Sequence, residues 1–202
     1  MSAILLYKYP KGRHKRTQAP PAFSKYKDFR PYLVAEFSNT CVYCRTPDVI
    51  PGSRSFAVEH YLPKRHFRSL ETQYTNLFLA CHTCNGRKGQ YFPQTASDLF
   101  IPNPCDHVMF DHLRYDGSTA KSHSVNGQFA IERLLLNDSQ NVQKREIVAT
   151  LAVAVQEKRD EFRQMVVHLE KLALRGNKSA AAKLPLASRK ADMLAAAVDR
   201  FG

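Results

Sequence analysis

Cys41-Val-Tyr-Cys44 and Cys81-His-Thr-Cys84 are the two stretches that decide the fold of this 202-residue chain. Each is a Cys-x-x-Cys knuckle, and the dipeptide Glu59-His60 lies between them. Four thiolates in two knuckles suit a tetrahedral zinc ion, which takes soft ligands and brings no redox chemistry. A carboxylate beside a histidine, on the segment that the zinc would close, suits a second and catalytic metal. The pattern therefore predicts a small metal-dependent hydrolase built around a structural zinc.

The composition predicts a folded chain with reduced thiols. Hydrophobic residues make up 44% of it, with 12 Phe and 9 Tyr, which is enough to form a core. No apolar run approaches the roughly 18 residues of a membrane span, so we expect no membrane segment. The first ten residues lack the pattern of a secretory signal, so we expect a cytoplasmic protein. Reduced thiols favour metal over disulfides, and Cys105, which has no near partner, is expected to be a small buried side chain.

The positive charge of the chain is unevenly distributed. The net charge is +12, and five basic residues lie between Lys8 and Arg16, whereas the first acidic residue is Asp28. A second basic cluster follows Glu59-His60 directly and contains Lys64, Arg65, His66 and Arg68. A uniformly mixed surface would serve solubility alone. Clustered charge instead favours a polyanionic partner, most simply nucleic acid.

The order of motifs predicts an α+β protein. Residues 1–22 form a basic N-terminal arm that ends in Ala19-Pro20-Pro21 and is not expected to pack as regular structure. Residues 23–97 form the core. There we expect a helix starting near Pro31 and running to Phe37, a strand at 54–60, a polar loop at 62–75, a strand at 76–80, and a knuckle leading into a short helix at 81–91.

The remaining residues divide into an insert and a helical region. Residues 98–140 are predicted to be an irregular, turn-rich insert with a hairpin-type turn at Asp116-Gly117. Residues 141–202 are predicted to be helical. A long amphipathic helix is expected from Val142 to Arg175, stopped by Gly176-Asn177, and a last helix capped by Ser188 is expected to reach Arg200.

Residues 41–88 resemble the HNH endonuclease family, whose catalytic core is a ββα-metal finger. The matching segments are Cys-Val-Tyr-Cys at 41–44, Val-Glu-His-Tyr-Leu-Pro-Lys at 58–64, Tyr-Thr-Asn-Leu at 74–77 and Cys-His-Thr-Cys-Asn-Gly-Arg-Lys at 81–88. The chain is an HNN variant, because Asn85 stands where a third histidine is common. Glu59 likewise replaces the commoner aspartate, and both substitutions keep an oxygen ligand.

The resemblance implies a role for each matching position. His60 would be the general base that deprotonates a water attacking phosphorus in DNA. Glu59 and Asn85 would hold one divalent metal, for which oxygen ligands favour Mg²⁺ or Mn²⁺ without excluding zinc or nickel. Asn76 would tie the loop backbone so that His60 is aimed correctly. Contacts to phosphates are expected from Lys64, Arg65, Arg68, Arg87 and Lys88.

Segments outside the finger resemble the C-terminal part of stand-alone bacterial HNH proteins. These segments are residues 101–113, 116–117, 132–137 and 144–145. That group is similar to the HNH subunit of Septu-type anti-phage systems, which works beside an ATPase. The resemblance implies a role in defence, with the C-terminal helices docking on an ATPase subunit or on a second copy of the chain.

Plainer interpretations remain open for each motif. The four cysteines could form two redox pairs, and a Glu-His dipeptide alone is usually an ordinary surface pair. The finger could also be a non-catalytic module that only grips nucleic acid within a larger complex. Structural or surface roles are the simplest interpretation of the other histidines, namely His66, His82, His107, His112 and His123.

Overall fold

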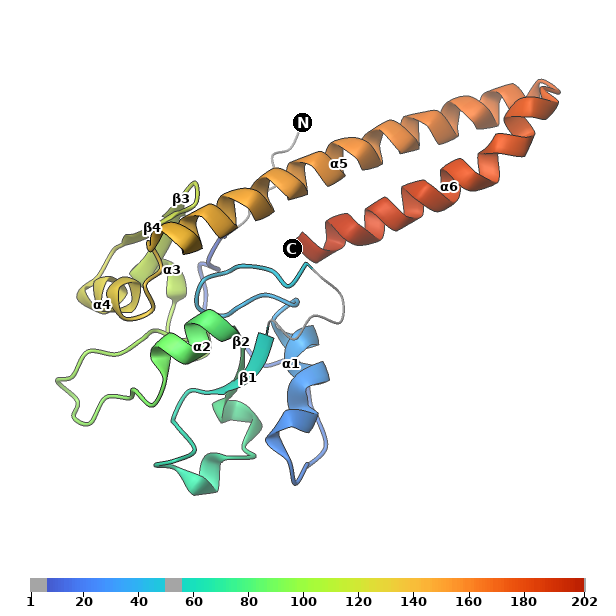
Figure 1. Ribbon diagram of the computed structural model, residues 1–202. Helices are drawn as coiled ribbons and strands as arrows, with labels where there is room; N and C mark the ends of the chain where they lie inside the picture. Colours follow the sequence, from blue (N-terminus) through green and yellow to red (C-terminus); the bar gives the residue numbers. More distant parts are fainter. Residues whose placement is uncertain (1–6, 50–55, 202) are drawn as a thin grey trace. The chain divides into compact units, whose positions relative to one another are not determined.

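A computed structural model describes residues 7–49 and 56–201 and confirms the mixed α+β class. The chain divides into two compact units, and the boundary falls between Glu146 and Ile147, inside a long helix. The helices and strands (Figure 1) are α1 (Arg30–Glu36), β1 (Phe56–His60), β2 (Leu77–Cys81), α2 (His82–Lys88), α3 (Met109–His112), β3 (Leu113–Asp116), β4 (Thr119–Ser122), α4 (Val125–Arg133), α5 (Ser139–Leu174) and α6 (Lys178–Val198).

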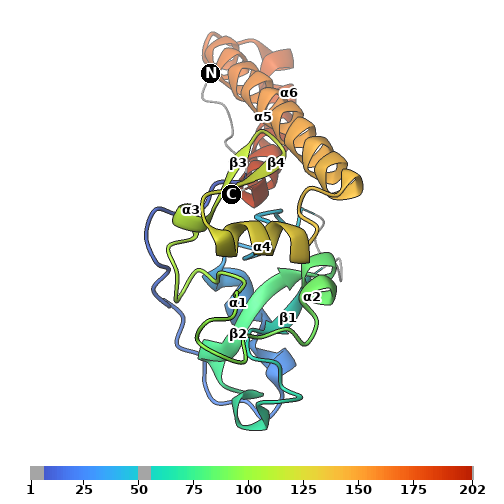
Figure 2. The same ribbon diagram turned by 90° about the vertical axis from the view of Figure 1, so that its left-hand side faces the viewer.

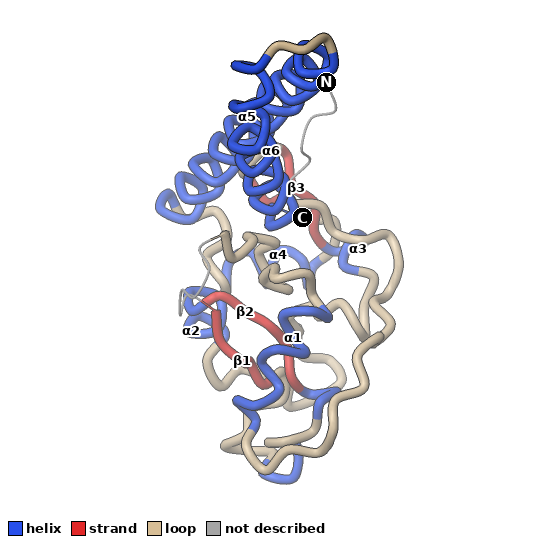
Figure 3. The backbone as a smooth tube through the Cα atoms, turned by 90° about the vertical axis from the view of Figure 1, so that its right-hand side faces the viewer, coloured by secondary structure: helices blue, strands red, loops and turns tan. Residues whose placement is uncertain are grey.

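The first unit is built on the antiparallel hairpin of β1 and β2. Its register pairs Phe56 with Cys81 and His60 with Leu77. Every residue of β2 is buried, whereas in β1 only Phe56 and Glu59 are buried and the other three residues are partly exposed. Helix α2 follows β2 without a loop and packs on both strands, while α1 packs on β2 (Figures 2 and 3). The predicted order of strand, loop, strand and helix is confirmed.

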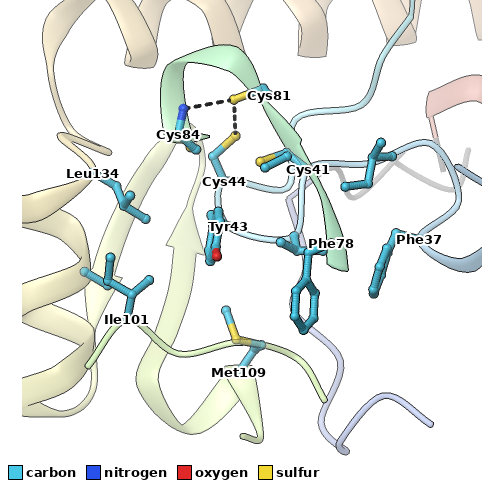
Figure 4. Close-up of a cluster of buried hydrophobic side chains, with 14 of the residues drawn as sticks. Phe37, Cys41, Tyr43, Cys44, Phe78, Cys81, Cys84, Ile101, Met109 and Leu134 are labelled. Atoms are coloured by element: carbon cyan, nitrogen blue, oxygen red, sulfur yellow. Dashed lines mark hydrogen bonds between the residues drawn. The ribbon is translucent and has the colours of Figure 1, made fainter. Parts of the chain in front are cut away.

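The core of this unit gathers side chains from the finger and from the segment after residue 98. Phe37, the residue that follows α1, stacks on Phe78 of β2 with ring centres 5.7 Å apart. Ile101, Met109 and Leu134 belong to the same buried cluster as the cysteines and Phe78 (Figure 4). The burial of these three side chains shows that the segment completes the core of the zinc-knuckle finger.

The insert at 98–140 is more regular than predicted. The hairpin turn at Asp116-Gly117 is confirmed by strands β3 and β4, but α3 and α4 were not expected. Ser124 caps α4 by accepting a hydrogen bond from the Gly127 amide at 2.9 Å. A Cβ at Gly127 would lie 2.0 Å from the carbonyl oxygen of His112, so only glycine fits there.

A buried arginine joins the first turns of α5 to the rest of the first unit. The Arg145 side chain is almost fully buried and donates hydrogen bonds to the carbonyl oxygens of Ser118 (2.7 Å) and Leu136. Its guanidinium lies 5.1 Å from the ring centre of Tyr115, whose hydroxyl donates to the Cys44 carbonyl at 3.1 Å. The start of α5 is thus part of the core behind the first knuckle.

The N-terminal arm has no helix or strand over residues 7–22, as expected, yet it packs on the first unit. The buried Glu36 carboxylate accepts hydrogen bonds from the Thr17 and Gln18 amides at 2.9 and 3.0 Å. Burial opposes ionisation of this carboxylate, but those amides, His14 and Tyr74 outweigh it and lower the pKa of Glu36 to about 2. The arm is therefore held to α1 by an ionised, fully bonded carboxylate.

Arg16 adds a second attachment of the arm. Its guanidinium carbon lies 5.0, 4.8 and 4.7 Å from the ring centres of Phe37, Tyr74 and Phe78. The same group donates a 2.7 Å hydrogen bond to the Leu77 carbonyl at the start of β2. Because it is enclosed by aromatic rings, Arg16 is a packing residue, although it belongs to the basic run from Lys8 to Arg16 that favours a polyanionic partner.

The second unit is a helical hairpin of α6 and the part of α5 after Glu146. The long helix ends at Leu174, Gly176 adopts a positive φ of 83°, and the Asn177 side chain accepts from the Ala180 amide to cap α6. The predicted cap at Ser188 is wrong, because the alanine-rich start of α6 already favours helix. None of the helices in the described part of the chain combines the length and apolar character of a membrane span.

Candidate active site

The four knuckle cysteines converge on one buried point. Their Sγ atoms all lie within 4.8 Å of one another, and the Cys44 and Cys81 sulfurs are 3.8 Å apart. Zinc–sulfur bonds of about 2.3 Å in a tetrahedron place the sulfurs about 3.8 Å apart. The residues therefore fit a structural zinc, and the interpretation as two separate redox pairs is disfavoured. Cys105 lies outside this cluster.

The electrostatics of the cluster suit a cation. Hydrogen bonds from the Cys41, Cys81 and Cys84 thiols hold the pKa of Cys44 well below its usual range. Burial raises the pKa of Cys41 well above its usual range, because a lone thiolate there would lack solvent. Hydrogen bonds among the sulfurs thus favour a thiolate within the cluster, and a bound metal would favour the ionised form of all four cysteines.

His60, the predicted general base, lies at the end of β1 with its ring held on two sides. The ring packs edge-on against Tyr26 with ring centres 4.7 Å apart, and Nε2 lies 2.9 Å from the Glu71 carbonyl oxygen. A carbonyl can only accept, so Nε2 carries the proton and Nδ1 keeps the basic lone pair. Burial lowers the pKa of His60, which leaves the imidazole neutral near pH 7.

Asn76 fastens the loop that supplies the Glu71 carbonyl. Its Oδ1 accepts from the Leu62 amide at 2.8 Å, and its Nδ2 donates to the carbonyls of Leu62 and Leu70 at 3.0 and 3.3 Å. Leu62 and Leu70 stand at the two sides of the loop, and Leu70 is the neighbour of Glu71. Asn76 is therefore placed to fix the carbonyl that orients His60.

Glu59, the predicted metal ligand, is buried with 2% of its surface exposed. Its Oε1 lies 2.7 Å from the Lys88 ammonium, and its Oε2 accepts from the Tyr43 hydroxyl at 3.0 Å. Each carboxylate oxygen thus already has a protein donor, and the role of Glu59 as a metal ligand stays a prediction. Asn85, the second predicted ligand, is half-buried in α2, one turn before Lys88.

The predicted phosphate contacts divide into two groups. Arg65, Arg68 and Arg87 are exposed and accessible to a polyanion. Lys64 is partly committed, since its ammonium pairs with Glu71 at 3.0 Å. The structure corrects the predicted phosphate contact of Lys88. Its side chain is 1% exposed and its ammonium is bonded to Glu59, so it does not reach the surface where a phosphate would lie.

Sequence reasoning did not single out Tyr43 and Glu71. Glu71 acts through a backbone carbonyl, which no side-chain pattern reveals. Tyr43 stands inside the first knuckle, and only the position next to Cys44 hints at a role. The histidines of the insert take structural contacts, as expected: His107 stacks on Phe100 at 4.4 Å, and His112 bonds Ser124 at 2.7 Å.

Comparison with known proteins defines the class of this site. Residues 41–90 match the family model of the HNH endonucleases, so this part of the chain is an HNH endonuclease domain. The match covers both knuckles, the β1–β2 hairpin and α2. No solved structure matches the chain.

The chain is also similar to the Septu protein PtuB of Bacillus thuringiensis. The two are 29% identical over 134 residues, which is 64% of this chain and 51% of the relative. The chain thus spans about half the length of this curated relative. The similarity extends well beyond the finger and agrees with the resemblance that the insert and the helical region suggested.

Proposed function

We propose that this protein is a metal-dependent nuclease that hydrolyses phosphodiester bonds in DNA, with His60 as general base. The observation that carries the proposal is the fixed, neutral imidazole of His60 beside Glu59. Its Nε2 is committed to the Glu71 carbonyl at 2.9 Å, which leaves Nδ1 as the proton acceptor. A water bonded to Nδ1 would lose its proton as it attacks phosphorus in line.

Glu59 and Asn85 are proposed to hold one divalent cation of the Mg²⁺ or Mn²⁺ type. Both supply oxygen ligands, and solvent and the scissile phosphate would complete the coordination. When bound, the metal supplies charge neutralisation at the phosphate and at the leaving 3′ oxygen. The protein contributes the orientation of Glu59, which is set by its bonds to Tyr43 and Lys88.

The basic residues around the site are proposed to bind the phosphate backbone. Arg65, Arg68 and Arg87 are exposed, and Lys8, Lys11, Arg13 and Lys15 of the arm are also exposed. Arg16 and Glu36 fasten the arm to the first unit. The exposed charges of the arm therefore lie on an ordered segment, which reduces the conformational entropy lost on binding DNA. No recognition helix is evident in the part of the chain that the structure describes, so we expect little sequence preference.

A cleavage assay tests this function directly. Zinc-loaded protein is incubated with supercoiled plasmid, linear duplex and single-stranded DNA, while Mg²⁺ or Mn²⁺ is titrated from zero. We expect nicked or linear products that require the added divalent ion and disappear when that ion is removed by gel filtration, with the zinc content checked by elemental analysis. Tight DNA binding without any product would instead favour the non-catalytic binding module.

The role of the protein is proposed to be an effector of anti-phage defence, supported by its similarity to the Septu protein PtuB. The helical hairpin supports a docking role, because it exposes Leu151, Val153, Met165, Val167, Leu186 and Met193. A groove on the hairpin is lined by Val166, Val167, Ala191 and Ala195. The occupant would be an ATPase subunit or a second copy of the chain.

Light scattering over a range of concentrations distinguishes the two occupants. Self-association through the hairpin would give a dimer that Val167→Glu disrupts, whereas a monomer that binds a purified ATPase subunit only with Val167 intact would support the other. A monomer that binds neither would exclude docking through this face.

A further inference from the structure

We propose that Tyr43 and Lys88 form a clamp on Glu59, and that through this clamp the four-cysteine site positions the Glu59-His60 dipeptide. The inference rests on the proposed nuclease function. Tyr43 and Lys88 are called the Glu59 clamp below. Neither side chain is accessible to DNA, since both are almost fully buried. They are positioning residues, because each touches only the protein.

One side of the clamp comes from the second knuckle. Lys88 lies one helical turn after Cys84 in α2, so the two inward-facing side chains stack along the buried face of that helix. The Lys88 ammonium lies 2.7 Å from Glu59 Oε1 and donates to the His60 carbonyl at 3.0 Å. A single cation thus holds both residues of the dipeptide.

The other side comes from the first knuckle. Tyr43 lies between Cys41 and Cys44 in sequence and is 1% exposed. Its hydroxyl donates to Glu59 Oε2 at 3.0 Å, so the two carboxylate oxygens are held by different knuckles. The Tyr43 carbonyl accepts from the Tyr9 hydroxyl, which fixes the knuckle backbone from the arm side.

The Glu59 clamp links the four-cysteine site to the proposed catalytic residues. The cysteines fasten the first knuckle to α2, and each fastened segment extends one donor to the same carboxylate. Donors placed on both oxygens fix the rotation of the carboxylate, and the bond to the His60 carbonyl fixes the end of β1. Ionised partners make short, directional hydrogen bonds, which suits such a role.

A purely structural role would differ in its consequences. A buried ion pair that only satisfies charge would lower stability when broken, without affecting how His60 is held. Positioning instead predicts that removing Lys88 changes the orientation of His60 and acts on catalysis through Glu59. The two roles separate in kinetic and spectroscopic measurements on folded, zinc-loaded protein.

The experiment compares Lys88→Met, Tyr43→Phe and Glu59→Gln, singly and in pairs, with Lys121→Met as a matched control for an exposed lysine. For Lys88→Met we expect kcat to fall by about 100-fold with KM for plasmid DNA unchanged, as for a misplaced catalytic group. Glu59→Gln combined with Lys88→Met should be no slower than the slower single variant, because both disturb one unit. Lys88→Arg should restore part of the rate.

A nitrogen-15 spectrum of the His60 ring tests the clamp without any cleavage. Wild-type protein should show Nε2 protonated, and Lys88→Met should show a mixed tautomer population as the bond to Glu71 loosens. An unchanged His60 spectrum, or additive effects of Lys88→Met and Glu59→Gln, would overturn the clamp and leave the nuclease proposal standing. A wild-type protein that never cleaves would overturn the nuclease alone, and the spectrum would still decide the clamp. If Lys88→Met fails to fold, Tyr43→Phe provides the same comparison with the core volume kept.

Discussion

At the scale of single residues, the candidate site depends on a few hydrogen bonds of fixed direction. His60 is oriented by a carbonyl, and that carbonyl belongs to a loop held by Asn76. The sequence predicts His60, Glu59 and Asn76 because their spacing matches a family pattern. It does not predict the Glu71 carbonyl or the inward course of Lys88, since these follow from how a loop and a helix pack in three dimensions.

Replacement of His60 by alanine should remove the proton acceptor. We expect kcat on plasmid DNA to fall by about 100- to 10,000-fold with DNA affinity unchanged, because a general base acts in the transition state. Single-turnover cleavage and a separate binding titration measure the two quantities. His168→Ala, at an exposed position of α5, is the matched control. Near-normal cleavage by His60→Ala would exclude the assignment.

Asn85→Ala should weaken the hold on the catalytic metal. The Mg²⁺ or Mn²⁺ concentration for half-maximal cleavage should rise, whereas the zinc content should not change, because Asn85 is not one of the four cysteines. Thr83→Ala, exposed on the same helix, serves as the control. A metal titration that is identical for wild type and Asn85→Ala would remove Asn85 from the site.

At the scale of elements, the fold of the finger was predictable and the elements around it were less so. The order from β1 to α2 follows from the knuckles and from short apolar runs. Helix α4 was missed because its apolar residues follow no long stripe, and its start is signalled only by Ser124. The start of α6 was misplaced because Ser188 resembles a cap, whereas Asn177 provides the cap observed.

The folding of the two knuckles should depend on a bound zinc ion. Cys44→Ser removes one of four ligands, and structural zinc contributes about 10 kcal/mol of apparent binding energy in small fingers, which is folding energy when no preformed site exists. We expect the variant to lose zinc by elemental analysis and to lose the cooperative unfolding transition of the finger. Cys105→Ser, a cysteine outside the cluster, should keep both. A well-folded Cys44→Ser variant without zinc would contradict the structural role.

The arm should loosen in acid. The pKa of Glu36 is lowered from 4.5 to about 2, so its ionised form stabilises the folded state above pH 4.5, and this contribution is lost as the pH falls toward 2. The unfolding free energy of wild type should therefore fall more steeply in this window than that of Glu36→Gln, which cannot titrate. Both proteins lose zinc in acid, so the difference between them is the informative quantity. Parallel curves would show that Glu36 does not hold the arm.

At the scale of the whole molecule, charge is the property most relevant to a polyanionic partner. The chain carries +12, and the arm contributes exposed lysines at Lys8, Lys11 and Lys15. The sequence predicts this excess directly. It does not reveal that Arg16, in the same run, is enclosed by aromatic rings, because burial depends on the docking of the arm.

Substitution of an exposed and of an enclosed basic residue of the arm should have different effects, the first on DNA binding and the second on stability. For Lys11→Ala we expect the slope of log K for DNA against log salt to fall by about 1, for any DNA sequence. Arg16→Ala should instead lower thermal stability, since its guanidinium packs on Phe37, Tyr74 and Phe78. Binding titrations at several salt concentrations and a melting curve measure the two effects. An unchanged slope for Lys11→Ala would place the DNA elsewhere.

The buried guanidinium of Arg145 sets the smallest fragment of the first unit that can fold. It is bonded to the carbonyls of Ser118 and Leu136, and it is the seventh residue of α5, which continues to Leu174. A shortened chain that ended where the helix begins would expose two orphaned acceptors and remove the cation that faces Tyr115. An autonomously folding fragment must therefore include the first two turns of α5, so the point at which the chain can be divided lies within a helix and not in a linker.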